Sequence, residues 1–416
     1  MAILWQRHLY TLFKPIPRKP ETSRRAIVAS LGGRFADELL SGMPGVLMPT
    51  FRATFGLSYA QISLLSLALD YVAVVVEPVS GVLIDLWSRR WLMAWGAFFI
   101  GLSILLMGLA PTFLLLLLAF ACYGLGSGPL AHTADVVLVE AHPEAPDRIF
   151  ARATLLDTLG ALLSPLLITG ALWLGLSWRS PLLAAGAAGL LYALLLLRTT
   201  FPPPANGEAE HDNPWQGIRA NLALVLRDRQ MWRWLLFLLA FDLLEAPHVF
   251  RTVWLHEHVG MSQALVGVYV ALEMAVNLIS LLALDHWLQR WTPRAILRLA
   301  IAGLLVLIPL WLLLPGAGAR FLLALPLNFL LAVFWPIGRA QVLTSVPGRA
   351  GTVTALTSLF GLVPLPLLFG LLAEAITLTA AILVVQVGAL LLLALLVRRM
   401  PEAATAGRPP AALSQS

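Results

Sequence analysis

Charged side chains stand inside apolar segments of this chain at the spacing of an α-helix. Arg34, Asp37 and Glu38 occupy positions i, i+3 and i+4, so one helix face would carry a cation and two acids. Arg34 can neutralise one of these acids. Burial and a neighbouring like charge favour the neutral form of the other carboxyl group, which suits a proton carrier. The alternative is a fixed network of ion pairs that locks the helices together.

A comparable set occurs in the second half of the chain. Asp242 and Glu245 occupy the corresponding place, and Arg251 follows further along the same segment. In another segment, His132 and Asp135 share one helix face. Because histidine titrates near neutral pH, this pair could relay protons, although a hydrogen-bonded interior histidine is the commoner explanation of such a residue.

Ionisable side chains inside a bilayer cost at least ~2.5–3.5 kcal/mol each on insertion scales, and they usually face a bundle interior or water. Their positions therefore mark the elements that line an aqueous pathway. Acids outnumber arginines inside the apolar segments, which favours proton coupling over fixed salt bridges for the group as a whole. The candidate residues for proton coupling or a substrate cavity are Arg34, Asp37, Glu38, Asp70, His132, Asp135, Asp157, Asp242, Glu245, Arg251, Glu273 and Arg339.

The composition is that of a polytopic membrane protein. The 416 residues are 59% hydrophobic and 12% charged, with a mean hydropathy of +0.84, whereas a soluble domain is about 45–50% apolar and about 25% charged. The single cysteine, Cys122, excludes an intramolecular disulfide and a cysteine metal cluster. No histidine–acid spacing predicts a metal site, and no Walker-type phosphate loop is present. We therefore expect no metal, no cofactor and no coupling to ATP.

Twelve segments are long and apolar enough to cross a bilayer, which takes about 20 residues each. Six precede the hydrophilic stretch 200–230 and six follow it, so the prediction is an all-α membrane protein with twelve transmembrane helices in two pseudo-symmetric six-helix bundles. The predicted parts are an N-terminal tail (1–25), a first bundle (26–199), a linker (200–230), a second bundle (231–397) and a C-terminal tail (398–416). The predicted spans are 26–53, 62–84, 91–109, 112–139, 153–174, 181–197, 234–256, 263–284, 295–314, 320–345, 352–373 and 378–397.

Lysine and arginine predict the orientation of these spans, because cytoplasmic loops carry an excess of both. Of the 28 basic residues, only Arg179 and Arg320 fall in loops that would lie outside if the N-terminus is inside. We therefore expect a multi-pass protein of the cytoplasmic membrane with both termini in the cytoplasm. Topology accounts for the basic composition, so no nucleic-acid partner is expected.

The charged residues follow a rhythm of three helices. Predicted helices 3, 6 and 12 carry no charge, and helix 9 carries only Arg298 near one end, whereas most of the others carry charge. Helix 11 is an exception, because it carries no charge either. A central cavity would produce this pattern if two helices of each triplet reach water and the third faces lipid. Interrupted helices often mark binding sites in transporters. Prolines and glycines predict interruptions in helices 1, 7, 10 and 11, at residues that include Pro44, Pro247, Pro336 and Pro364.

A short hydrophilic block between predicted helices 2 and 3 reads Gly81-Val-Leu-Ile-Asp85-Leu-Trp-Ser-Arg89-Arg90. A weaker copy lies 200 residues later, between helices 8 and 9, and contains Asp285. The first block resembles the signature loop of the major facilitator superfamily of secondary transporters. That resemblance implies twelve helices in two parallel halves, with helices 1, 4, 7 and 10 lining a cavity.

The resemblance also implies a gate. Asp85 would contact the start of helix 11, at Gly351 and Thr352, or the basic residues Arg148 and Arg152 after helix 4, and so hold the inner side shut. The block departs from the family pattern at Leu86 and Ser88, and a plain cluster of topology-setting charges is the alternative. The predicted gating residues are Gly81, Asp85, Arg89, Arg90, Arg148, Arg152 and Asp285.

Predicted helix 5 contains Gly160, Ser164 and Pro165 in a pattern similar to the antiporter motif of the superfamily, with serine in place of the second glycine. This motif favours efflux, and generic packing of small residues is the alternative. Segments 36–42, 55–61 and 128–132 resemble the fosmidomycin-resistance type of efflux carrier.

We therefore expect a monomeric transporter, not an enzyme, that works by alternating access and exports a small amphipathic or anionic compound in exchange for protons. Arg34, Arg251 and Arg339 could meet an anionic substrate, so proton-coupled uptake of an organic anion is the second hypothesis. A membrane sensor or enzyme without transport is a third, and an enzyme would need a nucleophile beside a base, which the sequence does not contain.

Overall fold

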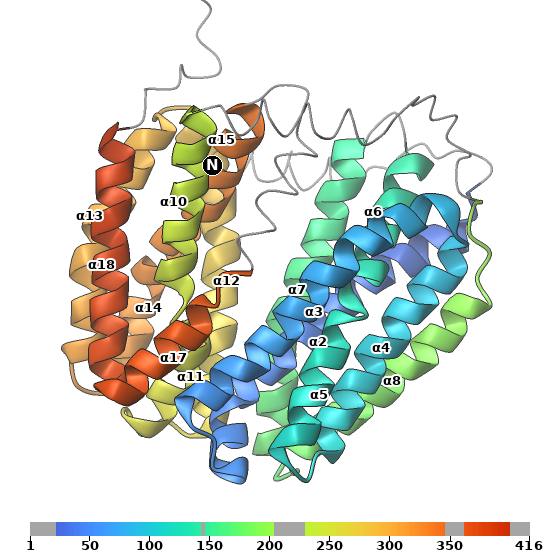
Figure 1. Cartoon of the computed structure of the whole chain (residues 1–416), viewed down its shortest axis with the longest axis horizontal. Helices are drawn as coiled ribbons and strands as arrows, with labels where there is room; N and C mark the ends of the chain where they lie inside the picture. Colours follow the sequence, from blue (N-terminus) through green and yellow to red (C-terminus); the bar gives the residue numbers. More distant parts are fainter. Residues whose placement is uncertain (1–21, 143–145, 204–228, 346–361, 400–416) are drawn as a thin grey trace, which may run out of the picture. The chain divides into compact units, whose positions relative to one another are not determined.

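The computed structural model describes residues 22–142, 146–203, 229–345 and 362–399. This part of the chain is α-helical and contains no β-strand (Figure 1). The chain divides into two compact units. Unit 1 comprises Met1–Glu210 and Ser262–Ala271, and unit 2 comprises His211–Met261 and Leu272–Ser416. Most of the predicted linker 200–230 lies outside the described residues.

Unit 1 contains seven described helices that correspond to the first six predicted spans. The fourth span consists of two helices, α5 and α6, and each of the others is one helix. They are α2 (Arg24–Phe55), α3 (Tyr59–Leu86), α4 (Arg89–Leu109), α5 (Phe113–Gly124), α6 (Ser127–Ala141), α7 (Pro146–Trp173) and α8 (Arg179–Leu197).

Local sequence signals fix where several of these helices begin and end. Ser23 caps the start of α2 by accepting a hydrogen bond from the backbone nitrogen of Ala26, and Gly56 ends the helix in the left-handed conformation at φ 61°. Ser58 and Gln61 form a reciprocal capping box at the start of α3. The loop between the two helices is therefore short and well defined.

Unit 2 contains the remaining helices, and its first and fourth spans are again divided. The first turns of α12 belong to unit 1, where the Thr169 hydroxyl donates a hydrogen bond to the carbonyl of Ala264 at 3.2 Å. The helices are α10 (Arg229–Glu245), α11 (His248–Glu257), α12 (Gln263–Leu288), α13 (Pro293–Leu313), α14 (Ala317–Leu331), α15 (Phe334–Ser345), α17 (Leu365–Ala375) and α18 (Leu378–Arg399).

Nine segments of the described chain are long and apolar enough to cross a membrane when α5–α6 and α14–α15 are each taken as one span. Three predicted spans are not among these nine segments, and the described residues show why. The helix α2 and the pair α10–α11 carry the charged residues identified above. The helix α17 has 11 residues, and the preceding part of its span lies outside the described residues.

The interruptions differ in part from those expected. Helix 1 was predicted to break at its prolines, and this is wrong, because α2 continues through Pro44 and Pro49 as one helix of 32 residues. Helix 4 is interrupted instead, between Gly124 and Ser127. The breaks beside Pro247 and before Pro336 occur as predicted, since proline lacks the N–H that would bond to the carbonyl four residues earlier. A break predicted at Pro326 is wrong, because α14 continues through it.

Glycines bring the helices of unit 1 into direct contact. A Cβ atom on Gly101 of α4 would lie 2.7 Å from the backbone nitrogen of Leu190 in α8, and one on Gly186 would lie 2.6 Å from the nitrogen of Leu105. Gly126 meets Gly96 in the same way. Small residues permit such close approach between membrane helices.

Unit 2 fills its interior with larger side chains. The ring of Phe334 in α15 stacks on Phe241 in α10 with centroids 5.7 Å apart, and Phe237 stacks on the same ring at 6.2 Å. Trp254 in α11 packs on Trp311 in α13 at 4.8 Å. Aromatic rings therefore join α10 to α15 and α11 to α13.

Candidate functional site

The charged residues of α2 lie against α6 and α7 in unit 1. Arg34 donates a hydrogen bond to Asp157 of α7 at 2.5 Å and one to Asp135 of α6 at 3.4 Å. All three side chains are mostly buried, with 12–22% of their surface exposed. One guanidinium therefore joins three helices and contacts two carboxyl groups.

The partners of Arg34 differ from those expected. The sequence predicts that Arg34 neutralises Asp37 or Glu38 on its own helix, but its hydrogen bonds go to Asp135 and Asp157. Side chains on a helix lean toward its N-terminus, so Arg34 leans away from acids three and four residues after it. This order of cation and acid is also the weaker one for pairing within a helix.

Two carboxyl oxygens in this cluster lack partners. Oδ1 of Asp135 and Oδ1 of Asp157 are buried and have no hydrogen-bond partner among the described residues. A buried polar atom without a partner is costly. A proton on either oxygen would remove a charge that one guanidinium cannot balance.

Asp37 is held by hydroxyl groups from α5 and α6. It is 8% exposed, and its two oxygens accept hydrogen bonds from Tyr123 at 2.9 Å and Ser127 at 3.0 Å. The Tyr123 hydroxyl also lies 2.8 Å from the backbone carbonyl of Asp37. Both donors flank the interruption between Gly124 and Ser127, so the break in helix 4 places them around this carboxylate.

The antiporter-like motif packs α7 onto α2 beside these acids. A Cβ atom on Gly160 would lie 2.5 Å from the carbonyl oxygen of Phe35 and 3.2 Å from the Cβ of Glu38. Ser164 lies against Gly42 one turn later, and Pro165 follows within the same helix. The motif therefore brings α7, which carries Asp157, close to the helix that carries Arg34.

His132 and Asp70 lie outside this cluster. His132 on α6 is exposed, and no hydrogen bond to Asp135 is found in the described part of the chain. Asp70 on α3 is also exposed. The predicted relay through His132 and Asp135 therefore stays a prediction.

Unit 2 contains a second buried pair. Arg251 of α11 donates to Oε1 of Glu273 in α12 at 2.5 Å, and the two side chains are 9% and 3% exposed. The amide of Asn328 in α14 donates to the same oxygen at 3.2 Å, while its carbonyl lies 3.3 Å from Arg251. One cation, one acid and one amide thus join three helices.

The other candidates of unit 2 lie apart from this pair. Asp242 is exposed, and Glu245 lies 3.6 Å from Nδ1 of His248. The guanidinium of Arg339 lies 5.7 Å from the ring centre of Trp335. The structure therefore does not join Asp242 and Glu245 to Arg251 by an ion pair within the described residues.

The predicted gating block contains one well-defined contact. Arg89 is 1% exposed and forms two parallel hydrogen bonds to Glu140 at the end of α6, at 2.7 and 2.9 Å. Bidentate pairs of this kind combine strength with fixed geometry. They join the start of α4 to the end of α6.

Three other predicted gating residues, Gly81, Arg90 and Arg152, lie among the described residues. Arg90 lies over the ring of Trp91 at 5.7 Å, Arg152 is partly buried, and nothing lies within 4 Å of a Cβ built on Gly81. The side chains of Asp85, Arg148 and Asp285 and the expected partners Gly351 and Thr352 are outside the described residues.

Sequence reasoning missed four residues of these networks: Tyr123, Ser127, Glu140 and Asn328. A signal was present for two of them, because Tyr123 and Ser127 stand four residues apart and would share one face of an uninterrupted helix. Asn328 is a single polar residue in an apolar segment, and Glu140 stands at the start of a polar stretch that includes His142 and Glu144. Nothing in the spacing of either residue points to its partner. Among the described residues, no group of three His, Cys, Asp or Glu could hold a metal ion.

The fold resembles those of several solved transporters. The nucleoside transporter NupG aligns with a TM-score of 0.75 and 15% identity, covering 90% of this chain and 98% of that chain. A bacterial homologue of the human lysosomal transporter Spinster, in an inward-facing and occupied conformation, has a TM-score of 0.71 and 17% identity over 89% of this chain and 94% of that chain. A variant of the peptide transporter POT in complex with alafosfalin has a TM-score of 0.69 and 13% identity over 92% and 96%.

These identities establish the fold alone, and no curated protein matches the sequence. The sequence profile of the Major Facilitator Superfamily matches residues 31–365. This match covers most of the chain and confirms the predicted fold of twelve membrane helices in two bundles. The family indicates a secondary transporter and not an enzyme. The chain belongs to the Major Facilitator Superfamily.

Proposed function

We propose that this chain exports a small amphipathic or anionic compound across the cytoplasmic membrane in exchange for protons. The observation that carries the proposal is the excess of acid around Arg34, where Asp135 and Asp157 both contact one guanidinium and each keeps a buried oxygen without a partner. Ionisable groups inside membrane spans commonly form proton relays. Asp37, held by Tyr123 and Ser127 in the same unit, supplies a further carboxyl group.

The direction of transport rests on helix 5. Gly160 and Ser164 pack α7 directly against α2, as the antiporter-like reading of the motif requires. The likeness to the fosmidomycin-resistance branch points the same way. Both arguments come from the sequence resemblance, and the packing supports them.

The substrate class follows from the arginines. Arg34 and Arg251 each hold carboxylates, so neither guanidinium is an open anchor for an anion. This favours an amphipathic compound over a strongly anionic one. It also makes uptake of an organic anion, which would need such anchors, the weaker hypothesis.

A gating role for the block at Gly81–Arg90 remains part of the proposal. The bidentate contact of Arg89 with Glu140 fixes the block to the end of α6. If Asp85 closes the gate, the substitution Asp85→Asn lowers turnover while the amount of inserted protein stays unchanged. Normal turnover of that variant would contradict the gating role.

Flux measurements test the central proposal. A thermal-shift screen of amphipathic compounds and organic anions on the purified protein selects a ligand, and the ligand is then loaded into vesicles that contain the protein. We expect a pH gradient to accelerate its movement in the direction opposite to that of the protons. Identical rates with and without the gradient would reject proton coupling, and acceleration in the same direction as the protons would favour uptake.

A further inference from the structure

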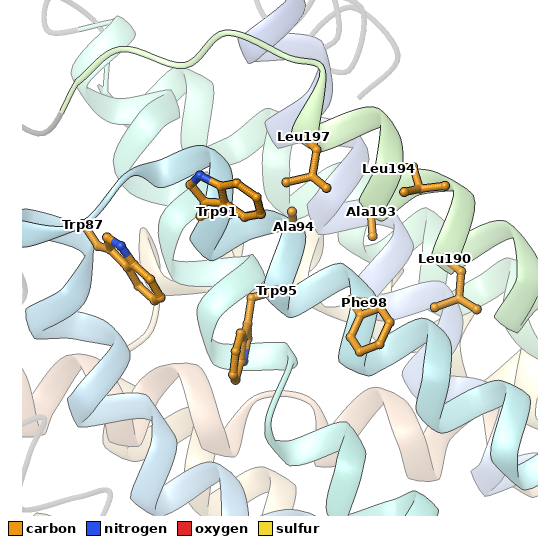
Figure 2. A pocket seen from close by; sticks show the side chains of 9 residues that line it. All are labelled: Trp87, Trp91, Ala94, Trp95, Phe98, Leu190, Ala193, Leu194 and Leu197. Carbon is orange, nitrogen blue, oxygen red and sulfur yellow. The ribbon is translucent and has the colours of Figure 1, made fainter.

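An apolar groove lies on unit 1 where α4 runs beside α8 (Figure 2). Its volume is about 400 Å³. The lining is entirely apolar except for indole nitrogens and consists of Trp87, Trp91, Ala94, Trp95, Phe98, Leu190, Ala193, Leu194 and Leu197. The groove plays no part in the polar networks described above.

The sequence explains why a groove forms at this place. Glycines 101, 186 and 189 draw α4 and α8 into backbone contact along the middle of their length. Toward the start of α4, the positions between the helices are Ala94 and Ala193, each 5% exposed. Large side chains stand on either side of them, with Trp91 51% and Leu194 58% exposed. Small buried residues thus form a floor between bulky walls.

The groove extends further along its membrane span than a ring of aromatic residues at the membrane interface would. Tryptophans commonly lie at the level of the lipid headgroups, and Trp87 and Trp91 fit this pattern at the start of α4. Trp95 and Phe98 continue the line, and Phe98 lies roughly 10 Å further along the helix than Trp91 at the usual rise per residue. The groove therefore extends from the headgroup level into the hydrocarbon.

Two cations lie at the headgroup end. Arg90 is exposed and its guanidinium lies 5.7 Å from the ring centre of Trp91. Arg198 is exposed and directly follows Leu197 at the end of α8. Trp91 and Leu197 both line the groove and lie near each other in Figure 2. Basic residues beside helices on the cytoplasmic side attract anionic lipid headgroups.

The corresponding helix of unit 2 lacks these features. Positions 287 and 291 keep the tryptophans, but Trp287 packs on Phe329 with ring centres 5.3 Å apart. Ala295 and Arg298 stand where unit 1 has Trp95 and Phe98, so the line of large aromatic residues ends after Trp291. The groove is therefore formed at α4 and α8 of unit 1, and the corresponding helix α13 of unit 2 lacks the line of aromatic residues that forms one of its walls.

We propose that this groove binds one acyl chain of an anionic phospholipid of the bilayer, with the phosphate held by Arg90 and Arg198. The apolar walls recognise the chain, and the two guanidinium groups select the negative headgroup. A zwitterionic phospholipid would fill the same walls without this selection.

Fluorescence quenching by brominated lipids tests the proposal on the full-length protein. The protein is reconstituted in phosphatidylcholine vesicles that contain a small fraction of lipid with brominated acyl chains, which is either phosphatidylglycerol or phosphatidylcholine. Because Trp87, Trp91 and Trp95 line the groove, we expect stronger quenching by the phosphatidylglycerol. Each arginine should contribute roughly fivefold to the relative binding constant.

Variants locate the effect. The double substitution Arg90→Gln with Arg198→Gln should abolish the preference for phosphatidylglycerol, and the change of both residues to lysine should preserve it. Replacement of the three tryptophans by phenylalanine should remove the excess quenching, because the reporters are lost while the walls remain. The matched control is Arg298→Gln, an exposed arginine near the start of the corresponding helix α13, which should change nothing.

Several results would overturn the proposal. Equal quenching by the two lipids would show that the groove holds ordinary bulk lipid. A preference that survives the double glutamine substitution, or that Arg298→Gln also abolishes, would place the anionic lipid elsewhere. Groove tryptophans that neither lipid quenches, in a protein that sediments as a dimer, would show that a second copy of the chain covers the groove.

Discussion

Units 1 and 2 both bury an arginine against acid, but they balance its charge differently. In unit 1, Arg34 faces two aspartates, and each aspartate has a buried oxygen without a partner among the described residues. In unit 2, Arg251 pairs with Glu273, and the amide of Asn328 bonds to both. A proton could therefore enter the first cluster without removing its last ion pair, whereas a proton on Glu273 would remove the pair with Arg251. This difference leads to the proposal that unit 1 carries protons, whereas unit 2 would supply a fixed link between helices.

The largest effect on stability is expected from breaking the link in unit 2. The substitution Arg251→Met leaves Glu273 buried without its cation, and removal of one partner of a buried pair costs about 3–5 kcal/mol. Unfolding of the purified protein in detergent measures this loss. The double variant with Arg251→Met and Glu273→Met should recover most of it, because no charge is then buried. Equal stability of the single and double variants would contradict a balanced pair.

The next effect concerns transport and not stability. Asp157→Asn keeps the shape of the side chain but removes the excess acid beside Arg34. We expect flux to lose its response to a pH gradient, while exchange of the selected ligand without a gradient continues. Flux in vesicles under both conditions is the measurement. A variant that still responds fully to the gradient would remove Asp157 from the proton pathway.

A smaller effect is expected from substituting a glycine that lies against a neighbouring helix, in comparison with a glycine that does not. Gly101→Ala in unit 1 places a Cβ atom 2.7 Å from the backbone of α8, and such overpacking typically costs about 1–3 kcal/mol. The matched change Gly388→Ala in α18 of unit 2 meets nothing within 4 Å. It should be neutral or stabilising by up to about 1 kcal/mol, because alanine favours a helix. Thermal unfolding of both variants compares them, and similar losses would refute the distinction.

The smallest effect is expected at Asp242. This residue is exposed and lies outside the buried pair of unit 2, so Asp242→Asn should change the free energy of unfolding by no more than about 0.5 kcal/mol. The variant should also respond normally to a pH gradient. Loss of that response would show that both units take part in proton coupling.

The sequence was sufficient for the membrane spans because each span is a local property. Twenty apolar residues predict a membrane helix wherever they stand, and the capping signals at Ser23 and Ser58 lie within three residues of their partners. The interruption of helix 4 was missed because glycines are common in membrane helices and do not by themselves predict a break. Gly124 and Gly126, which flank the break, both contact neighbouring helices.

The residues of the candidate site were identified from the sequence, but their contacts with one another were not. Arg34, Asp135 and Asp157 were all identified from the cost of placing charge in a span, yet they are separated by 101 and 123 positions along the chain. The pairing depends on how α2, α6 and α7 pack, which no local pattern encodes. Asn328 was missed because it is uncharged. An amide costs less than a charge inside a membrane span, so the cost of burying charge did not identify this residue.

The glycine contact between α4 and α8 has a consequence for assembly. Burying most side chains restricts their torsions, whereas Gly101, Gly186 and Gly189 have no torsions to restrict. Membrane helices form before they associate, so the backbone freedom that glycine surrenders is already lost when the two helices meet. Association of α4 with α8 therefore costs little entropy, and the two helices can pack together as soon as both are inserted, although three helices separate them in the sequence.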